Sequence, residues 1–221
     1  MSDSSSTFTS AGSPRTVSDV MTHTVVAVGR DATFKEVVEL LGQWKVSALP
    51  VLAGEGRVIG VVSEADLLPK EEFRDADDRL AGRDCDPAER AKAGALTAGE
   101  LMSSPAVTVH PDATLAEAAR IMARRRVKRL PVVDGIGLLQ GVVSRGDLLK
   151  VFLRPDQEIA DEVRRSVLTQ LPITTTVTAG VADGVVTLSG SLPDRGLVPV
   201  LARAVRAVEG VVDVRIDLVH R

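Results

Sequence analysis

The sequence contains no tyrosine, one tryptophan, four phenylalanines and a single cysteine in its 221 residues. With so few aromatic side chains it lacks the stacking platforms on which single-strand nucleic-acid binders depend. Its apolar cores must be built from Val, Leu, Ile and Ala. Cys85 has no partner in the chain, so no intrachain disulfide can form and nothing requires an oxidising compartment.

Long apolar runs and a large net charge are also lacking. No segment reaches the ~20 apolar residues that a membrane span requires, and the N-terminus has no apolar core behind its charges. We therefore expect a cytoplasmic protein without a transmembrane segment. The formal charge of -3 disfavours non-specific nucleic-acid binding, which draws most of its energy from neutralising phosphates. Only the basic run at 124–129 supports that class of function.

The most informative positive feature is an internal repeat with a constant offset of 81 residues, the spacing from Asp66 to Asp147. The segment 60–66 (GVVSEAD) returns as 141–147 (GVVSRGD). The same offset aligns other residues in pairs: Met21 with Met102, Asp31 with Asp112, Thr33 with Thr114, and Pro50 with Pro131. Because the two copies align without an insertion, we expect two structurally equivalent halves.

Periodicity and turn residues predict a β-α-β-β-α unit in each repeat. The first repeat is expected to contain a β segment at 25–28, a helix opened by the capping box Thr33-x-x-Glu36, strands at 48–52 and 58–62, and a short helix ending at Leu68. The second repeat is expected to contain a β segment at 106–109, a helix opened by Thr114-x-x-Glu117, strands at 130–133 and 138–143, and a short helix ending at Leu149. Apolar residues at helical spacing predict a core face: Phe34, Val37, Val38, Leu41 and Trp44. Pro50 and Pro131 predict open sheet edges, because proline cannot donate to a β ladder.

Composition divides the rest of the chain into three further segments. Residues 1–15 are predicted to form a disordered tail, and 70–96 a charged, solvated helical linker between repeats at 16–69 and 97–152. Residues 155–221 predict a separate α-β-β-α-β unit: a helix at 156–171, strands at 173–178 and 184–190 joined by a hairpin turn at Ala182-Asp183-Gly184, a helix at 194–208, and a strand at 211–219. The expected fold class is α+β.

Each repeat ends in Ser-x-x-Asp after an apolar strand, at Ser63 to Asp66 and Ser144 to Asp147. One interpretation is a helix start, in which the two side chains form a capping box. A second interpretation is a ligand site, because helix N-termini attract phosphate and a carboxylate can accept both hydroxyls of a ribose. The residues alone leave both interpretations open.

With these residues in view, the repeats resemble a tandem pair of CBS domains, often called a Bateman module. The resemblance rests on Asp19-Val20-Met21 and Glu100-Leu101-Met102, the Pro50-Val51 and Pro131-Val132 strands, and both Gly-Val-Val-Ser-x-x-Asp ends. The C-terminal unit resembles a BON domain through 183–190 (DGVVTLSG) and 208–214 (VEGVVDV). The resemblance implies a pseudo-twofold module that binds adenine nucleotides or adenosyl ligands in clefts between paired sheets and commonly forms a homodimer.

The resemblance also implies roles for particular residues. Asp66 and Asp147 would bind ribose hydroxyls, and Ser63 and Ser144 would face phosphates. Backbone groups at four positions would flank the base: Thr24 and Val26 in the first repeat, Pro105 and Val107 in the second. Arg129, in the basic run before the second proline strand, is a candidate phosphate ligand, and its counterpart in the first repeat, Ala48, is also a candidate nucleotide-binding residue. The alternative for this run is a solvated helix end.

No catalytic constellation accompanies these motifs. The chain shows no P-loop, no Ser/His/Asp set and no paired acid/base carboxylates with a supporting motif, so we predict no enzyme activity. His23, His110 and His220 are scattered, and a metal site is not expected; His23 could instead touch a base.

We predict a regulatory protein that binds AMP, ADP, ATP or a related adenosyl ligand, with or without Mg²⁺, and relays binding to a partner or to the BON domain. No other cofactor is required. The alternative is a nucleotide-independent dimeric scaffold whose BON domain binds phospholipid or another macromolecule.

Overall fold

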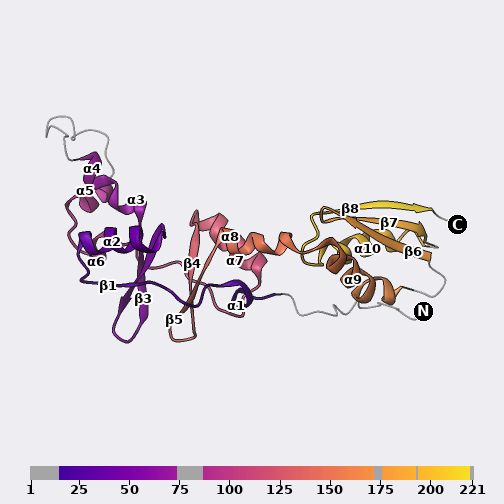
Figure 1. The fold of residues 1–221 in the computed structure, drawn as a ribbon, viewed down its shortest axis with the longest axis horizontal. Coiled ribbons are helices and arrows are strands. Elements are labelled where there is room, and N and C mark those ends of the chain that lie inside the picture. The colour runs from indigo at the N-terminus through magenta and orange to yellow at the C-terminus, as the bar shows by residue number, and fades with distance from the viewer. Residues whose placement is uncertain (1–14, 74–86, 172–175, 193, 220–221) are drawn as a thin grey trace. The chain divides into compact units, whose positions relative to one another are not determined.

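The computed structural model describes residues 15–73, 87–171, 176–192 and 194–219. It consists of two compact units, residues 16–145, here called the repeat unit, and residues from 146 onward, here called the C-terminal unit. Figure 1 shows the elements of both units. The disordered tail predicted for 1–15 lies outside the described residues except for Arg15, and Cys85 also lies outside them. The predicted α+β fold class is confirmed.

The first half of the repeat unit contains the helix α2 (Phe34–Trp44) and a sheet in the order β1-β2-β3, formed by Val28–Gly29, Ala48–Ala53 and Arg57–Ser63. The capping box predicted at Thr33 starts α2: the Glu36 amide donates to the Thr33 hydroxyl at 3.3 Å, and the Thr33 amide donates to the Glu36 carboxylate at 2.7 Å. Two residues of the predicted core face, Val37 and Leu41, are buried, whereas Val38 and Trp44 are exposed. That part of the prediction was wrong because the apolar stripe is wider than the surface that covers it.

The second half of the repeat unit follows the same plan. It contains α7 (Leu115–Arg125) and the strands β4 (Arg129–Val133) and β5 (Leu139–Ser144). The β segments predicted at 25–28 and 106–109 are shorter than expected. They reduce to the two residues of β1 and to a single bridge from Val109 to Val132.

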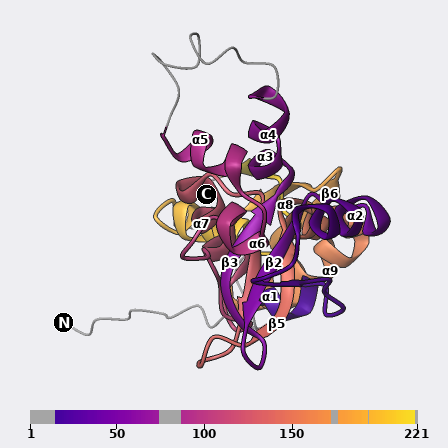
Figure 2. The same cartoon turned by 90° about the vertical axis from the view of Figure 1, so that its left-hand side faces the viewer.

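The opening segments of the repeats cross over to the opposite half. Helix α1 (Val17–Val20) hydrogen-bonds through its first amides to Ala113 and Pro111, and α6 (Ala98–Leu101) to Ala32 and Arg30. Thr22 then pairs with Val142 of β5, and Ser103 pairs with Val61 of β3. The strands β3 and β5 meet through a bridge between Arg57 and Leu138, and lie side by side in Figure 2. Each of these contacts maps onto its partner by the offset of 81, which gives the unit a pseudo-twofold arrangement.

The prediction that proline marks an edge strand was wrong in the first half, where β2 lies between β1 and β3. Pro131, the equivalent residue of the second half, shows why a proline is tolerated at this position. Its carbonyl accepts the amide of Val109 at 3.1 Å, so the proline nitrogen faces the same side. The parallel bridge between Val109 and Val132 begins at this hydrogen bond, so the pairing does not require the Pro131 nitrogen to donate.

The linker contains α4 (Pro69–Glu72) and α5 (Pro87–Gly94), and follows the short helix α3 (Glu64–Leu67). The described part of the linker is helical in these two segments. It is not solvated throughout, because Ala95 is buried in the core cluster of the first half and Lys92 contacts Asp66.

The C-terminal unit begins within α8 (Arg145–Leu149) and continues through a 3-10 turn at Lys150–Leu153 to α9 (Asp156–Ser166) and a second 3-10 turn at Leu168–Gln170. A sheet in the order β6-β7-β8 follows, formed by Thr176–Ala182, Val185–Ser191 and Asp213–Val219, with α10 (Leu197–Arg206) before the last strand. The α-β-β-α-β order is confirmed. Both helices are shorter than predicted, and among the described residues no helix is long and apolar enough to cross a membrane.

Two local devices shape the C-terminal unit. The hairpin turn predicted at Ala182-Asp183-Gly184 forms, but its loop is only Asp183 and Gly184, because Ala182 still pairs with Val185. Both loop residues have positive φ (51° and 73°), as an Asp-Gly turn requires. The first residue of α9, Asp156, accepts the amides of both turn residues at 2.8 Å. Residues Ile159, Val163, Leu188 and Leu201 are buried between the helices and one face of the sheet.

Candidate functional site

The candidate site is built around Asp66, the one polar or charged residue that is buried within the described ranges, with 8% of its surface exposed. It lies in α3, directly after β3 ends at Ser63. One carboxylate oxygen, Oδ2, accepts the Ser63 amide at 2.8 Å and the Ser63 hydroxyl at 2.6 Å. The predicted capping interaction is therefore formed, and it brings two predicted site residues together.

The other carboxylate oxygen of Asp66, Oδ1, faces the linker and the second repeat. It accepts a hydrogen bond from the Lys92 ammonium of α5, 26 residues away, and lies 3.5 Å from the Ser103 hydroxyl. Lys92 is mostly buried, with 23% of its side chain exposed, against 10% for Asp66. Nothing in the sequence marks Lys92, because a lysine in a charged linker has no spacing that relates it to the Ser-x-x-Asp motif.

The start of α3 offers little to a phosphate by itself. The helix has four residues, and its first amide, that of Glu64, donates to the Ser47 carbonyl at 3.1 Å. The Ser63 hydroxyl donates to Asp66. The first helix amide and the serine hydroxyl are therefore already occupied.

The segments predicted to flank a base run between the two halves of the repeat unit. Pro105 and Val107 lie between Ser103, which pairs with β3, and Val109, which pairs with β4. Ser104 is tied to the same strand, since its hydroxyl donates to the Ile59 carbonyl at 2.9 Å. Asp66 therefore faces the opening segment of the other repeat.

Thr24 and Val26 occupy the equivalent path in the first repeat. They lie between Thr22, which pairs with Val142 of β5, and Val28, which pairs with Val51 of β2. The crossing places the Asp66 carboxylate next to Ser103, in the opening segment of the other repeat, which the repeat alignment alone does not reveal.

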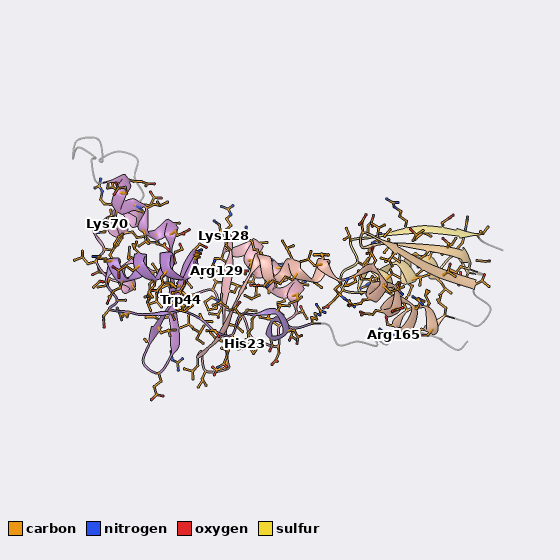
Figure 3. The ribbon with its side chains drawn as sticks, in the orientation of Figure 1. His23, Trp44, Lys70, Lys128, Arg129 and Arg165 are labelled. Carbon is orange, nitrogen blue, oxygen red and sulfur yellow. The ribbon has the colours of Figure 1, made fainter. Side chains whose placement is uncertain are left out.

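Arg129 reaches from the second half into the first. Its guanidinium donates to the Ser47 hydroxyl at 2.8 Å and to the Ala48 carbonyl at 3.3 Å. Figure 3 labels the Arg129 side chain. Ala48 is the ladder partner of Ser63, so the Arg129 guanidinium lies near the end of β3 where the Asp66 motif begins. Its guanidinium thus joins the two halves in this structure, and its role as a phosphate ligand stays a prediction.

In the second repeat, Ser144 ends β5 and is the ladder partner of Arg129. Asp147 belongs to the C-terminal unit, where its carboxylate accepts the Lys150 ammonium at 2.7 Å, three residues along the chain. In the first repeat the position of Lys150 is occupied by Pro69. Asp66 therefore contacts a lysine of the linker, whereas Asp147 contacts a lysine three residues further along its own segment.

Other candidate features are separate from this site. A hollow of about 650 Å³ lies beside β1 and α2, lined by residues between Ala27 and Gln43, none of which was predicted to bind ligand. His23 is exposed. No group of three or more His, Cys, Asp or Glu side chains suited to a metal ion occurs in the described part of the chain.

Comparison with known proteins identifies the domains. The CBS domain model matches residues 17–70 and 98–154, and the BON domain model matches residues 155–220. The chain belongs to the CBS-domain family. Its CBS pair is followed by a BON domain, as the sequence predicted.

Several relatives of the CBS pair are known. CBSX2 of Arabidopsis thaliana, solved in complex with AMP, is 30% identical with a TM-score of 0.53, covering 63% of this chain and 97% of the CBSX2 chain. YhcV of Bacillus subtilis is 31% identical over 132 residues, 60% of this chain and 81% of its own length. MJ1426 of Methanocaldococcus jannaschii is 29% identical over 62% of this chain and 90% of its own length.

An enzyme also matches. An inosine-5'-monophosphate dehydrogenase of Korarchaeum cryptofilum is 29% identical over 136 residues, which are 61% of this chain but 23% of that enzyme.

Proposed function

We propose that the CBS pair is a regulatory module that binds an adenosine-containing ligand, with Asp66 as a ribose ligand. The observation that carries the proposal is the buried carboxylate of Asp66 at the crossing of the two repeats. A carboxylate held in place by the Ser63 amide and hydroxyl is oriented before a ligand arrives. Its other oxygen, Oδ1, can accept hydrogen bonds from the hydroxyls of a ribose.

The relatives support the same ligand class. CBSX2, which was solved in complex with AMP, is similar to this chain over 97% of the CBSX2 chain. CBSX2 and YhcV are named as CBS domain-containing proteins, and an inosine-5'-monophosphate dehydrogenase matches over 23% of its length. We therefore infer regulation rather than catalysis. Homodimer formation through the CBS pair, a cytoplasmic location and a relay to the BON domain stay predictions from the sequence.

The test is calorimetric titration of the full chain with AMP, ADP, ATP and S-adenosylmethionine, with and without Mg²⁺. Asp66→Asn is the informative variant, because the amide oxygen can still accept from Ser63 while the second ribose hydroxyl loses its acceptor. We expect at least a tenfold weaker affinity for the ligand that binds, which corresponds to about 1.4 kcal/mol. Glu64→Gln, on the same helix, is the control and should bind as the unmodified chain does.

Two results would contradict the proposal. If none of the four compounds binds, the CBS pair has no adenosine ligand among them, and the scaffold alternative with a lipid-binding BON domain becomes the better account. Vesicles of phosphatidylglycerol and phosphatidylcholine would then test that alternative by co-sedimentation. If a compound binds equally to the chain with Asp66→Asn, Asp66 is not its ribose ligand.

A further inference from the structure

The contact between Lys92 and Asp66 carries an inference about the class of ligand. Lys92 comes from the linker helix α5, outside both CBS matches, which end at residue 70 and resume at residue 98. It nevertheless contacts the carboxylate on which the proposed function depends. The linker therefore supplies a charged group to the proposed ligand site at Asp66, here called the first cleft.

Lys92 and the ribose of a ligand compete for the same carboxylate oxygen of Asp66. Oδ2 already accepts two hydrogen bonds from Ser63, so a ribose hydroxyl must approach mainly at Oδ1, where Lys92 is bound. When the hydroxyls of a ligand take Oδ1, the ammonium loses its anion. Because a mostly buried ammonium without a partner is costly, it then needs another acceptor close by.

The ligand itself can provide that acceptor. We propose that Lys92 makes the first cleft selective for adenosine ligands that carry a phosphate, over neutral adenosine and over a positively charged adenosyl sulfonium. A phosphate on the ribose 5' carbon gives the displaced ammonium a new charge-assisted hydrogen bond. Neutral adenosine leaves it without an anion, and a sulfonium adds a second positive charge nearby.

This inference rests on the proposed function, and it adds the ligand class and a selectivity residue outside the repeats. The lysine that contacts the second aspartate, Lys150, has a side chain that is 62% exposed, so its ammonium can move into water when a ligand takes Asp147. Selectivity for a phosphate is therefore assigned to the first cleft.

The experiment compares the affinities of the full chain for AMP, adenosine and S-adenosylmethionine by calorimetry. Asp147→Asn is introduced in every chain, so that the predicted ribose ligand of the second repeat is absent. With Lys92 present, we expect AMP to bind at least tenfold more tightly than either other compound. With Lys92→Met the ratio of AMP to adenosine affinity should fall at least tenfold, while adenosine binds as well as before or better.

Matched variants separate charge from folding. Lys92→Arg keeps the charge and should keep the preference for AMP. Lys35→Met removes an equal charge from an exposed position of α2, where the side chain is 86% exposed, and should leave the ratio unchanged. Lys92→Gln is a second neutral variant to be measured if Lys92→Met does not fold, as judged by its thermal transition.

The outcomes distinguish this inference from the proposed function. An AMP preference that persists in the neutral variants, or its absence while Lys92 is present, overturns the role of Lys92 and leaves adenosine binding intact. Failure of these three compounds, and of ADP and ATP, to bind any of the chains overturns both.

Discussion

Met102, at the opening of the second repeat, lies directly against the backbone of Gly60 in the first. A Cβ on residue 60 would lie 2.8 Å from Met102 Cγ, and one on Gly141 would lie 2.7 Å from Met21 Sδ. Real Cβ atoms do not approach so closely, so each glycine provides room for the methionine of the other repeat. The glycines and methionines recur at the same offset because they meet crosswise.

Gly60→Ala should lower the free energy of unfolding by about 1–3 kcal/mol, because the added methyl group overpacks the contact with Met102. Chemical denaturation followed by circular dichroism measures the change. Gly42→Ala is the control: residue 42 lies within α2 with nothing within 4 Å of the added atom, and alanine there should stabilise by about 1 kcal/mol. Met102→Ala should recover part of the loss in the Gly60→Ala chain. Equal stability of Gly60→Ala and the unmodified chain would contradict the close approach.

Arg129→Ala should destabilise the repeat unit without any ligand, by about 1–3 kcal/mol, because its guanidinium joins the two halves through Ser47 and Ala48. A double-mutant cycle with Ser47→Ala isolates the hydrogen bond to the serine hydroxyl, and a coupling of at least ~0.5 kcal/mol is expected. Arg125→Ala, from the end of α7, serves as the comparison for loss of a basic side chain. Additive effects of Arg129→Ala and Ser47→Ala would show that this bond contributes nothing to stability.

Asp156→Ala should destabilise the BON domain by about 1–3 kcal/mol, because the carboxylate accepts the amides of both turn residues, Asp183 and Gly184. Hydrogen exchange should show faster exchange at these two amides in particular. Asp156→Asn, which retains an acceptor, should have an intermediate effect, and Gln157→Ala, the next and exposed residue of α9, should have little. Unchanged exchange at residues 183 and 184 would argue against this cap.

Acid should weaken the repeat unit through two capping glutamates. The Thr33 amide lowers the pKa of Glu36, and the amides of Leu96 and Thr97 lower the pKa of Glu100. The ionised forms are favoured in the folded state, so their contribution is complete above the usual glutamate pKa of about 4.3 and is lost as the pH falls through the lower folded values. The chain with Glu36→Gln and Glu100→Gln should lose less stability on acidification below about pH 4 than the unmodified chain.

Denaturation curves at a series of pH values measure this difference. Glu39→Gln, at an exposed position of α2, is the control for removing one charge. Parallel stability curves for the unmodified chain and the double variant would contradict the assignment.

Local signals in the sequence predicted much of the fold. Thr33-x-x-Glu36 starts α2 where expected, and Asp183 and Gly184 form the expected hairpin turn. These features depend on residues within a few positions of one another, so their chemistry can be read directly from the chain. Element lengths were less predictable. The first strand reduces to Val28–Gly29, and the preceding chain pairs at Thr22 with Val142 of the other repeat.

The part of the candidate site that depends on residues close in sequence was also predicted. Ser63 and Asp66 are three residues apart, and their contact follows from the capping box. Lys92 could not be predicted, since its meeting with Asp66 depends on how the linker returns to the first half. Arg129 was singled out as a basic residue near the second strand, but its bonds to Ser47 and Ala48 depend on the packing of the two halves.

The repeat, its β-α-β-β-α order, the BON unit and the Ser-x-x-Asp caps can all be read from the sequence, because periodicity, glycine turns and capping are local properties. Which surfaces meet depends on the folded arrangement. The opening segments cross between repeats, so that Met102 covers Gly60 and Ser103 approaches Asp66. Such contacts depend on backbone pairing over long sequence separations, and the residue types on either side are compatible with more than one pairing.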